Sequence, residues 1–343
     1  MNHHPQTQPK APTLLLLALF GGLTGGFCGS QPAISADEKP AASAASQDPA
    51  NPAAQTAPQQ PAADLPPADE ILNQARSRLE GLDSLECDLQ QTALIGGMKI
   101  LASGHYTEAS GNRVQLTFRM YPMATAKADD AKASALDAPP TELKPEDNKG
   151  ELQQISDGTV VYTSWKNGDT VRVTRRNLRD IQTAATSATG FESGSIAMDL
   201  GVGGLRSLIS RLQTSMVFAP VRKVTAGERT LLEVTGRWSD RVRRELFGLP
   251  ENTFVDARPW VPEYCRVYVD QETMLLRRIQ YLKHSPNPAD KLARPLLTLD
   301  LRNLKLNGPV DDDMFRFTPP ENTPIEDQTE AVIEAIRNAK PGK

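Results

Sequence analysis

Three consecutive runs between residues 84 and 120 alternate apolar with polar side chains. Because successive side chains of a strand point to opposite faces, a period of two gives each run one apolar face and one mostly polar face. Residues 95–97 and 110–112, between the runs, include the Gly and Asn that tight hairpin turns favour. The pattern predicts three antiparallel strands of one curved sheet, with an apolar face made of Leu85, Cys87 and Leu89, then Met98, Ile100, Ala102, Gly104 and Tyr106, then Val114, Leu116, Phe118 and Met120.

Further elements are expected on both sides of these strands. A helix is predicted from residue 68 to Gly81, because apolar residues recur there at helical spacing: Ile71, Leu72, Ala75 and Leu79. Strands are expected at 151–156, 159–165, 170–175, 222–224, 230–238, 264–270, 274–282 and 296–306, with a short helix at 241–247. The apolar phase shifts within the last of these strands, which predicts a bulge near Arg302. The C-terminal part is expected to form a strand at 314–317 and a helix within 325–339, with one apolar face that carries Val332, Ile333 and Ile336.

A separate amphipathic helix is predicted around residues 205–212, where apolar residues recur at i, i+3, i+4 and i+7. Its apolar positions are Leu205, Leu208, Ile209 and Leu212, and the glycines before it are Gly201, Gly203 and Gly204. The glycines make this helix a candidate lid, and the alternative is a helix packed permanently on the core. As a lid, it is expected to face the concave side of the sheet, opposite Val114, Leu116 and Phe118.

The first 67 residues are predicted to lie outside the folded domain. Residues 1–36 have the weakly basic start and short apolar core of a secretory signal peptide, with cleavage after Ala36. The alternative is lipoprotein processing, with a lipid attached at Cys28. Residues 37–67 are rich in Ala, Pro, Gln and Ser, and such a segment buries too little apolar surface to fold, so it is expected to be a disordered tether. The folded domain is placed at 68–330, with a flexible polar insertion at 122–150 and a helical tail at 331–343.

Composition argues against nucleic acid as a partner. The formal net charge is −4 with both signs interspersed, and aromatic residues make up only 5% of the chain, so neither electrostatic attraction nor base stacking is favoured. Besides Cys28, the cysteines are Cys87 and Cys265, and both lie on predicted apolar strand faces. A disulfide between them is one interpretation for an exported protein, and two buried small side chains is the other.

The sequence contains no recognisable catalytic constellation. His105 and His284 have no Cys, His or paired carboxylates at metal-ligand spacing, and both are interpreted as surface residues. There is no GxSxG elbow and no P-loop, and the glycines at 201–204 do not follow a strand of a βαβ unit. The run at 311–313 is interpreted as a solvated acidic turn. We therefore expect a protein that is not an enzyme and that has no cofactor and no resident metal.

Four segments, in the same order, resemble the periplasmic lipoprotein-carrier and lipoprotein-sorting family (LolA-like proteins). They are "ILNQARSRLEGLDSLECDLQQT", "GHYTEASGNRVQLTFRM", "LQQISDGTVVYTSW", where Ser156-Asp157-Gly158 matches the SDG turn of the family, and "DDDMFRFTPPENTPIEDQ", which resembles the closing strand and double proline. The resemblance spans most of residues 68–328. One departure concerns an arginine that the carriers have near the start of the third strand, in a stretch followed by Pro and an aromatic residue. In this chain that stretch reads Ser110, Gly111, Asn112, Arg113 and Val114, and the alternation places Arg113 on the outer face of the strand.

The resemblance implies an incomplete, half-open β-barrel of about eleven strands in the α+β class, with a helical lid and an apolar cavity for acyl chains. It further implies a monomeric periplasmic protein of the outer-membrane transport pathway, whose partners are the acyl chains of lipoproteins or other lipids, an inner-membrane release complex and an outer-membrane acceptor. The alternative is a tethered envelope scaffold or regulatory module that binds protein through the same fold. The residues expected to line the cavity and the lid are Leu89, Ile100, Val114, Leu116, Phe118, Met120, Trp165, Leu205, Leu208, Ile209 and Leu212.

Overall fold

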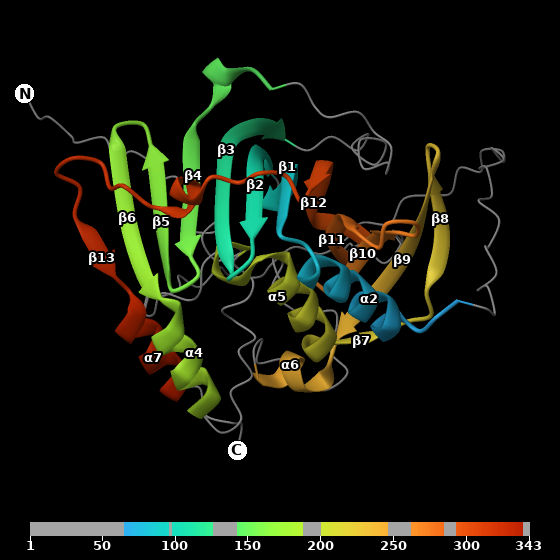
Figure 1. The fold of residues 1–343 in the computed structure, drawn as a ribbon. Coiled ribbons are helices and arrows are strands. Elements are labelled where there is room, and N and C mark those ends of the chain that lie inside the picture. Colours follow the sequence, from blue (N-terminus) through green and yellow to red (C-terminus); the bar gives the residue numbers. More distant parts are fainter. Residues whose placement is uncertain are drawn as a thin grey trace, which may run out of the picture.

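The computed structural model describes residues 65–95, 98–125, 143–187, 200–245, 262–284 and 293–338. Thirteen strands in this part of the chain form one open sheet in the order β13-β6-β5-β4-β3-β2-β1-β12-β11-β10-β9-β7, and β8 also pairs with β9 (Figure 1). The strands are β1 (Ser84–Ile95), β2 (Met98–Ala109), β3 (Arg113–Thr125), β4 (Gly150–Asp157), β5 (Val160–Asn167), β6 (Thr170–Asn177), β7 (Met216–Phe218), β8 (Arg222–Ala226), β9 (Arg229–Trp238), β10 (Tyr264–Asp270), β11 (Leu276–His284), β12 (Ala293–Leu306) and β13 (Ile325–Asp327).

The pairing is antiparallel throughout the sheet, except that β13 runs parallel to β6. Strand β1 joins the two halves of the sheet because it pairs with β2 on one side and with β12 on the other. This arrangement confirms the predicted fold class, a mainly antiparallel, incompletely closed sheet with helices. The strand count exceeds the expected eleven, since the short strands β7 and β13 also pair with the sheet.

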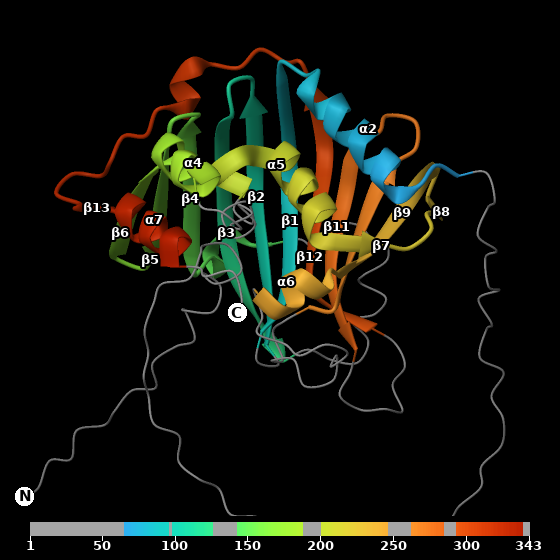
Figure 2. The ribbon, with the colours of Figure 1, turned by 90° about the horizontal axis from the view of Figure 1, so that it is seen from below.

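Five α-helices and two short 3₁₀ turns accompany the sheet in the described residues. They are α2 (Ala68–Glu80), α4 (Leu178–Ser187), α5 (Leu200–Ser215), α6 (Asp240–Glu245), α7 (Thr329–Asn338), η1 (Pro145–Asp147) and η3 (Asp312–Phe315). Helices α2 and α5 cross one face of the sheet, while α4 and α7 lie side by side at its β6 end (Figure 2). The elements that cover the sheet therefore come from both ends and from the middle of the chain.

Helix α2 forms as predicted. Asp69 and Glu70 lie in its first turn, where negative charge favours a helix start, and Gly81 ends it by donating its backbone N–H to the carbonyls of the last turn. Its four predicted apolar residues are all buried against the sheet. The helix is therefore stabilised mainly by the burial of one face, as is usual for amphipathic helices.

The hairpins follow the turn residues in the sequence. Gly158 has φ 93°, and a Cβ there would lie 2.1 Å from the carbonyl oxygen of Gly111, so only glycine fits this turn. Asp157 holds the same turn, since its Oδ1 accepts hydrogen bonds from the backbone N–H groups of Thr159 and Val160 at 2.7 and 2.8 Å. The Ser-Asp-Gly segment thus fixes the reversal between β4 and β5.

The predicted bulge near Arg302 is confirmed. Glu86 pairs with Lys305 and Asp88 pairs with Arg302, so β12 carries one residue more than β1 between these pairs. Asn303, inside this interval, has φ 51°, a left-handed conformation that asparagine tolerates better than most residues. The extra residue restores the apolar phase on both sides of the bulge.

The structure corrects two expectations and adds one helix. Residues 314–317 do not form a strand: 314 and 315 end the 3₁₀ turn η3, and 316 and 317 follow it outside any helix or strand. The side chain of Asp311 accepts a hydrogen bond from the N–H of Asp313 and so begins the turn. Helix α4 was not predicted. The insertion expected at 122–150 is shorter in the structure, since β3 continues to Thr125 and η1 precedes β4. Residues 126–142 lie outside the described residues, as do residues 1–64, which contain the predicted signal peptide, Cys28 and most of the predicted tether. The end of the predicted tether is described, and its Leu65 packs, partly buried, against the core.

Candidate functional site

The apolar face of the sheet and the predicted lid helix form one buried cluster. Leu205, Leu208, Ile209 and Leu212 of α5 are buried together with Leu89 of β1, Ala102 of β2 and the β3 residues Val114, Leu116, Phe118 and Met120. Trp165 packs against the cluster while partly buried, and Ile100 is half-buried. The structure therefore brings ten of the eleven expected lining residues to one place, and Ile100 lies outside the cluster.

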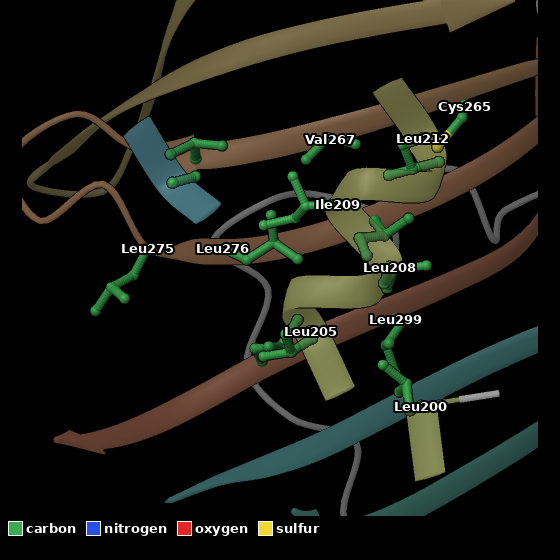
Figure 3. Packing of buried hydrophobic residues seen from close by; sticks show 14 of the residues in the cluster. Leu200, Leu205, Leu208, Ile209, Leu212, Cys265, Val267, Leu275, Leu276 and Leu299 are labelled. Atoms are coloured by element: carbon green, nitrogen blue, oxygen red, sulfur yellow. The ribbon is translucent and has the colours of Figure 1, made fainter. Parts of the chain in front are cut away.

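Helix α5 lies beside α2 on the same face of the sheet (Figure 2). It contacts α2, β3, β4 and β7, and its aliphatic side chains group with Cys265, Val267 and Leu276 of β10 and β11 (Figure 3). Residues from both halves of the sheet thus meet beneath one helix. Since apolar burial stabilises by roughly 25 cal/mol per Å², this helix is held on the sheet mainly by non-directional contacts.

A polar anchor fixes the first half of α5. Gly204 breaks the helix with φ 67° and ψ −168°, a conformation accessible essentially to glycine alone. The helix resumes at Leu205, whose backbone N–H donates to Glu108 Oε2 at 3.1 Å and to Tyr106 Oη at 3.2 Å. The Tyr106 hydroxyl donates to the same Glu108 oxygen at 2.7 Å, and Arg206 Nε donates to Glu108 Oε1, also at 2.7 Å. One carboxylate of β2 therefore holds the restart of α5.

Glu108 is a buried carboxylate, and both of its oxygens accept hydrogen bonds. Glu108 is only 5% exposed, and a negative charge at a helix N-terminus is stabilised by the helix dipole. Burial, together with the charge of Glu108, raises the pKa of Tyr106 well above its ordinary value. The phenol therefore stays protonated and donates to Glu108 across the physiological pH range.

The sequence reasoning missed Glu108 and Arg206. Glu108 occupies the apolar phase of its strand, two residues beyond Tyr106, and a carboxylate in that phase is the signal that could have identified it. Its partner Arg206 is 98 positions away. No local spacing rule connects the two residues, although Glu108 follows the apolar strand position Tyr106 and Arg206 follows the apolar helix position Leu205.

The two cysteines of the folded part are free, buried thiols. This is the second of the two interpretations made from the sequence, so no disulfide joins Cys87 to Cys265 in the structure. Burial, the largest influence, raises the pKa of Cys87 to about 12 and also raises that of Cys265. Thiols of this kind are poor nucleophiles and act as small apolar side chains.

The histidines and Arg113 have structural partners. His105 Nδ1 lies 3.1 Å from Asp88 Oδ1, and His284 Nδ1 lies 2.7 Å from Glu263 Oε2, while both histidine side chains are 43% exposed. Among the described residues, no group of three metal-ligating side chains is found. Arg113 pairs with Asp312 and lies over the ring of Phe315 at 5.0 Å. It therefore attaches the C-terminal segment to β3 and lies away from the apolar cluster.

Comparison with known proteins gives similarity at the level of fold. No family model matches the chain, and no curated protein matches it. Among solved structures, the Mycobacterium tuberculosis lipoprotein LppX is 12% identical with a TM-score of 0.35, over 72% of this chain and 98% of LppX. A LolA superfamily protein from Nitrosomonas europaea is 10% identical with a TM-score of 0.28, over 74% of this chain and 99% of that chain.

A third match is a chain of the Pseudomonas aeruginosa MucA/MucB complex, 9% identical with a TM-score of 0.32, over 73% of this chain and 61% of that one. At such identities and TM-scores, the matches assign neither a ligand nor a partner to this chain. No helix in the described part of the chain has both the length and the apolar character needed to cross a bilayer. The resemblance to LolA-like proteins therefore remains that of the four sequence segments quoted above.

Proposed function

We propose that this protein is a non-catalytic, exported lipid- or lipoprotein-binding protein that shelters acyl chains between helix α5 and the apolar face of its sheet. The observation that carries the proposal is the contrast within α5: its aliphatic face lies on apolar strands, and the carboxylate that holds it to the sheet acts only at the restart at Leu205. The hydrogen bonds that Ser210 and Gln213, in the second half of the helix, make to other elements go to α2 and not to the sheet. Acyl recognition requires apolar area and no catalytic group, in keeping with the absence of a catalytic motif from the sequence.

Ligand entry follows from an exchange of apolar contacts. Each fully buried Leu or Ile of α5 contributes roughly 1.5–3 kcal/mol, and ordering the glycine-containing segment before Leu205 opposes part of that gain. An acyl chain that takes over these contacts replaces the apolar surface that the helix gives up. The net free energy of opening is therefore small, which allows a ligand to shift the population toward the open state. In this proposal the protein acts as a periplasmic monomer that receives its ligand at the inner membrane and passes it to an outer-membrane acceptor.

Leu208→Asp tests the lid directly. The substitution places a charge under the helix, so we expect α5 to detach from the sheet and the binding of an apolar dye to rise without unfolding of the domain. The matched control is Val217→Asp, because Val217 is 48% exposed on β7 and its substitution should leave dye binding unchanged. Far-UV circular dichroism distinguishes a detached helix from an unfolded domain, and global unfolding by Leu208→Asp would show that α5 is core and not lid.

Native mass spectrometry of the mildly purified protein provides a second, independent test. We expect bound species with acyl-chain masses, and their removal should restore the capacity to bind added lipid. A protein that is empty on purification and indifferent to added lipid contradicts the proposal.

The near-complete burial of Leu205, Ile209 and Leu212 favours a second candidate. A helix packed this tightly is also what a filled core requires, and a protein with a filled core would act through its outer surface as a tethered scaffold or regulatory module. Crosslinking in cells separates the two functions, since a scaffold should be recovered with a defined protein partner and a carrier with lipid.

A further inference from the structure

The second half of α5 contains a buried arginine, Arg211, for which the described residues provide no counter-charge. Arg211 is only 6% exposed, and its Nε and Nη1 atoms are buried with no hydrogen-bond partner. Within the described ranges, no carboxylate forms an ion pair with it. The other arginine of the helix, Arg206, is paired with Glu108 at 2.7 Å.

An unpaired buried guanidinium is unfavourable in a folded protein. Removing a cation from water costs several kcal/mol unless a partner compensates, and buried charges are for that reason almost always paired. Burial lowers the pKa of Arg211 to about 10, with the nearby Tyr281 as a smaller, opposing influence. The side chain is still protonated at neutral pH, so the missing element is one negative charge with hydrogen-bond acceptors.

The surroundings of Arg211 are mainly apolar. Leu208 and Leu212 of the same helix belong to the buried cluster, as does Tyr281, which stacks on Trp238 with the ring centroids 6.3 Å apart. A small inorganic anion would lose its own hydration on entering such a place and gain no apolar contacts. An anion attached to an acyl chain gains those contacts at the same time.

We propose that Arg211 binds the anionic headgroup, a carboxylate or a phosphate, of an amphiphile whose acyl chain lies against the apolar face beneath α5. This inference rests on the proposed function and narrows its ligand from any acyl-bearing molecule to an anionic one. The planar guanidinium suits the role because its N–H groups match two oxygens of a carboxylate or phosphate at once.

The test compares four probes on the delipidated full chain by isothermal titration calorimetry, below their micellar concentrations: hexadecyl phosphate, hexadecanoate, 1-hexadecanol and inorganic phosphate. We expect both charged amphiphiles to bind about 10- to 100-fold more tightly than hexadecanol, as for a charge-assisted hydrogen bond. Arg211→Gln should reduce this ratio to about one with little change in hexadecanol affinity, and Arg211→Lys should retain a large part of it. The matched control is Arg172→Gln, because Arg172 of β6 is 56% exposed and pairs with Glu326 of β13, and the ratio should be unaffected there.

Each contrary result has a separate meaning. If wild-type protein binds the charged and neutral amphiphiles equally, or if Arg211→Gln keeps the preference, the inference is overturned and the proposed function stands. If inorganic phosphate binds as tightly as hexadecyl phosphate, Arg211 belongs to a simple anion site and the amphiphile is excluded. If no amphiphile binds, the proposed function and the inference both fail. The wild-type comparison decides the question even if one variant does not fold.

Discussion

The two arginines of helix α5 lie five residues apart and experience opposite environments. Arg206 reaches the Glu108 carboxylate beside the kink at Gly204, and this carboxylate also accepts hydrogen bonds from the Tyr106 hydroxyl and the Leu205 N–H. Arg211 is more deeply buried and has no carboxylate partner within the described residues. The first half of the helix is thus attached to the sheet by directional, charged bonds. The second half packs on the sheet through apolar side chains, is hydrogen-bonded to α2 through Ser210 and Gln213, and carries a charge that no described carboxylate compensates. The first end of the helix is therefore fixed to the sheet, and at the second end an anionic ligand would add stability.

Removal of the charge at the fixed end should have the largest effect. Glu108→Gln leaves Arg206 half-buried without a counter-ion and takes acceptor strength from Tyr106 and from the N–H of Leu205. Breaking one partner of a buried pair typically lowers stability by 3–5 kcal/mol, so we expect the free energy of unfolding to fall by about that amount. Urea denaturation at neutral pH measures it.

A double variant isolates the pair from the other contacts. Arg206→Gln in the Glu108→Gln background should cause little further loss, because the ion pair is already broken. If the two losses were instead additive, Arg206 and Glu108 would not be coupled, and the fixed end of the helix would depend on Tyr106 and the helix N-terminus alone.

Substitution of Gly204, at the kink, should cause the next largest loss of stability. Gly204→Ala places a residue with a Cβ in a conformation that is strained by about 1–3 kcal/mol, and that Cβ would lie 2.5 Å from Cδ of Glu108. We expect a loss of roughly 2–4 kcal/mol in urea denaturation and a weaker hydrogen bond at Leu205. Gly203→Ala is a poor control because a Cβ there meets Ser207, whereas Gly227→Ala, at a turn with open space and φ 57°, reports the backbone strain alone.

The comparison also shows how far the sequence could lead. Alternation identified the long strands because each buries one continuous apolar face, and the four apolar positions of α5 lie where their spacing put them. Helix α4 was not predicted because its buried face is short. Its Ile181 packs on Ile333 and Ile336 of α7, which are remote in sequence. The Glu108–Arg206 pair and the isolation of Arg211 depend on which distant side chains meet, and a period of two or 3.6 carries no such information.

Replacement of Arg211 by an apolar residue should raise the free energy of unfolding, whereas the preceding substitutions lower it. Arg211→Met keeps the length of the side chain and removes a buried cation, and apolar replacements of buried charges are often neutral or stabilising. We expect the ligand-free protein to gain roughly 1–2 kcal/mol in urea denaturation. Arg211→Lys, which keeps the charge, should show no such gain. A clear loss of stability in Arg211→Met would indicate that the guanidinium has a structural partner, and the contrast with Arg206 would disappear.

The smallest effect is expected at an exposed pair far from α5. Arg172 Nη2 lies 2.7 Å from Glu326 Oε2, where β13 pairs with β6, and both side chains are more than half exposed. Exposed pairs contribute little because water and salt screen them, so Arg172→Gln should lower stability by less than about 0.5 kcal/mol, and 1 M NaCl should abolish the difference.

The pH dependence of that pair provides its control. The hydrogen bond from Arg172, followed by that from Gln328, lowers the pKa of Glu326. The folded state therefore favours the ionised carboxylate, so this contribution is present above the unfolded value of about 4.3 and is lost as the pH falls through the lower folded pKa. In urea denaturation between pH 7 and pH 3, the small difference between wild type and Arg172→Gln should shrink toward the acid end. A difference in the free energy of unfolding above about 1 kcal/mol, or one that persists after Glu326 is protonated, would mean that Arg172 positions β13 by packing. In that case the exposure of an arginine side chain would not predict its contribution to the stability of this fold.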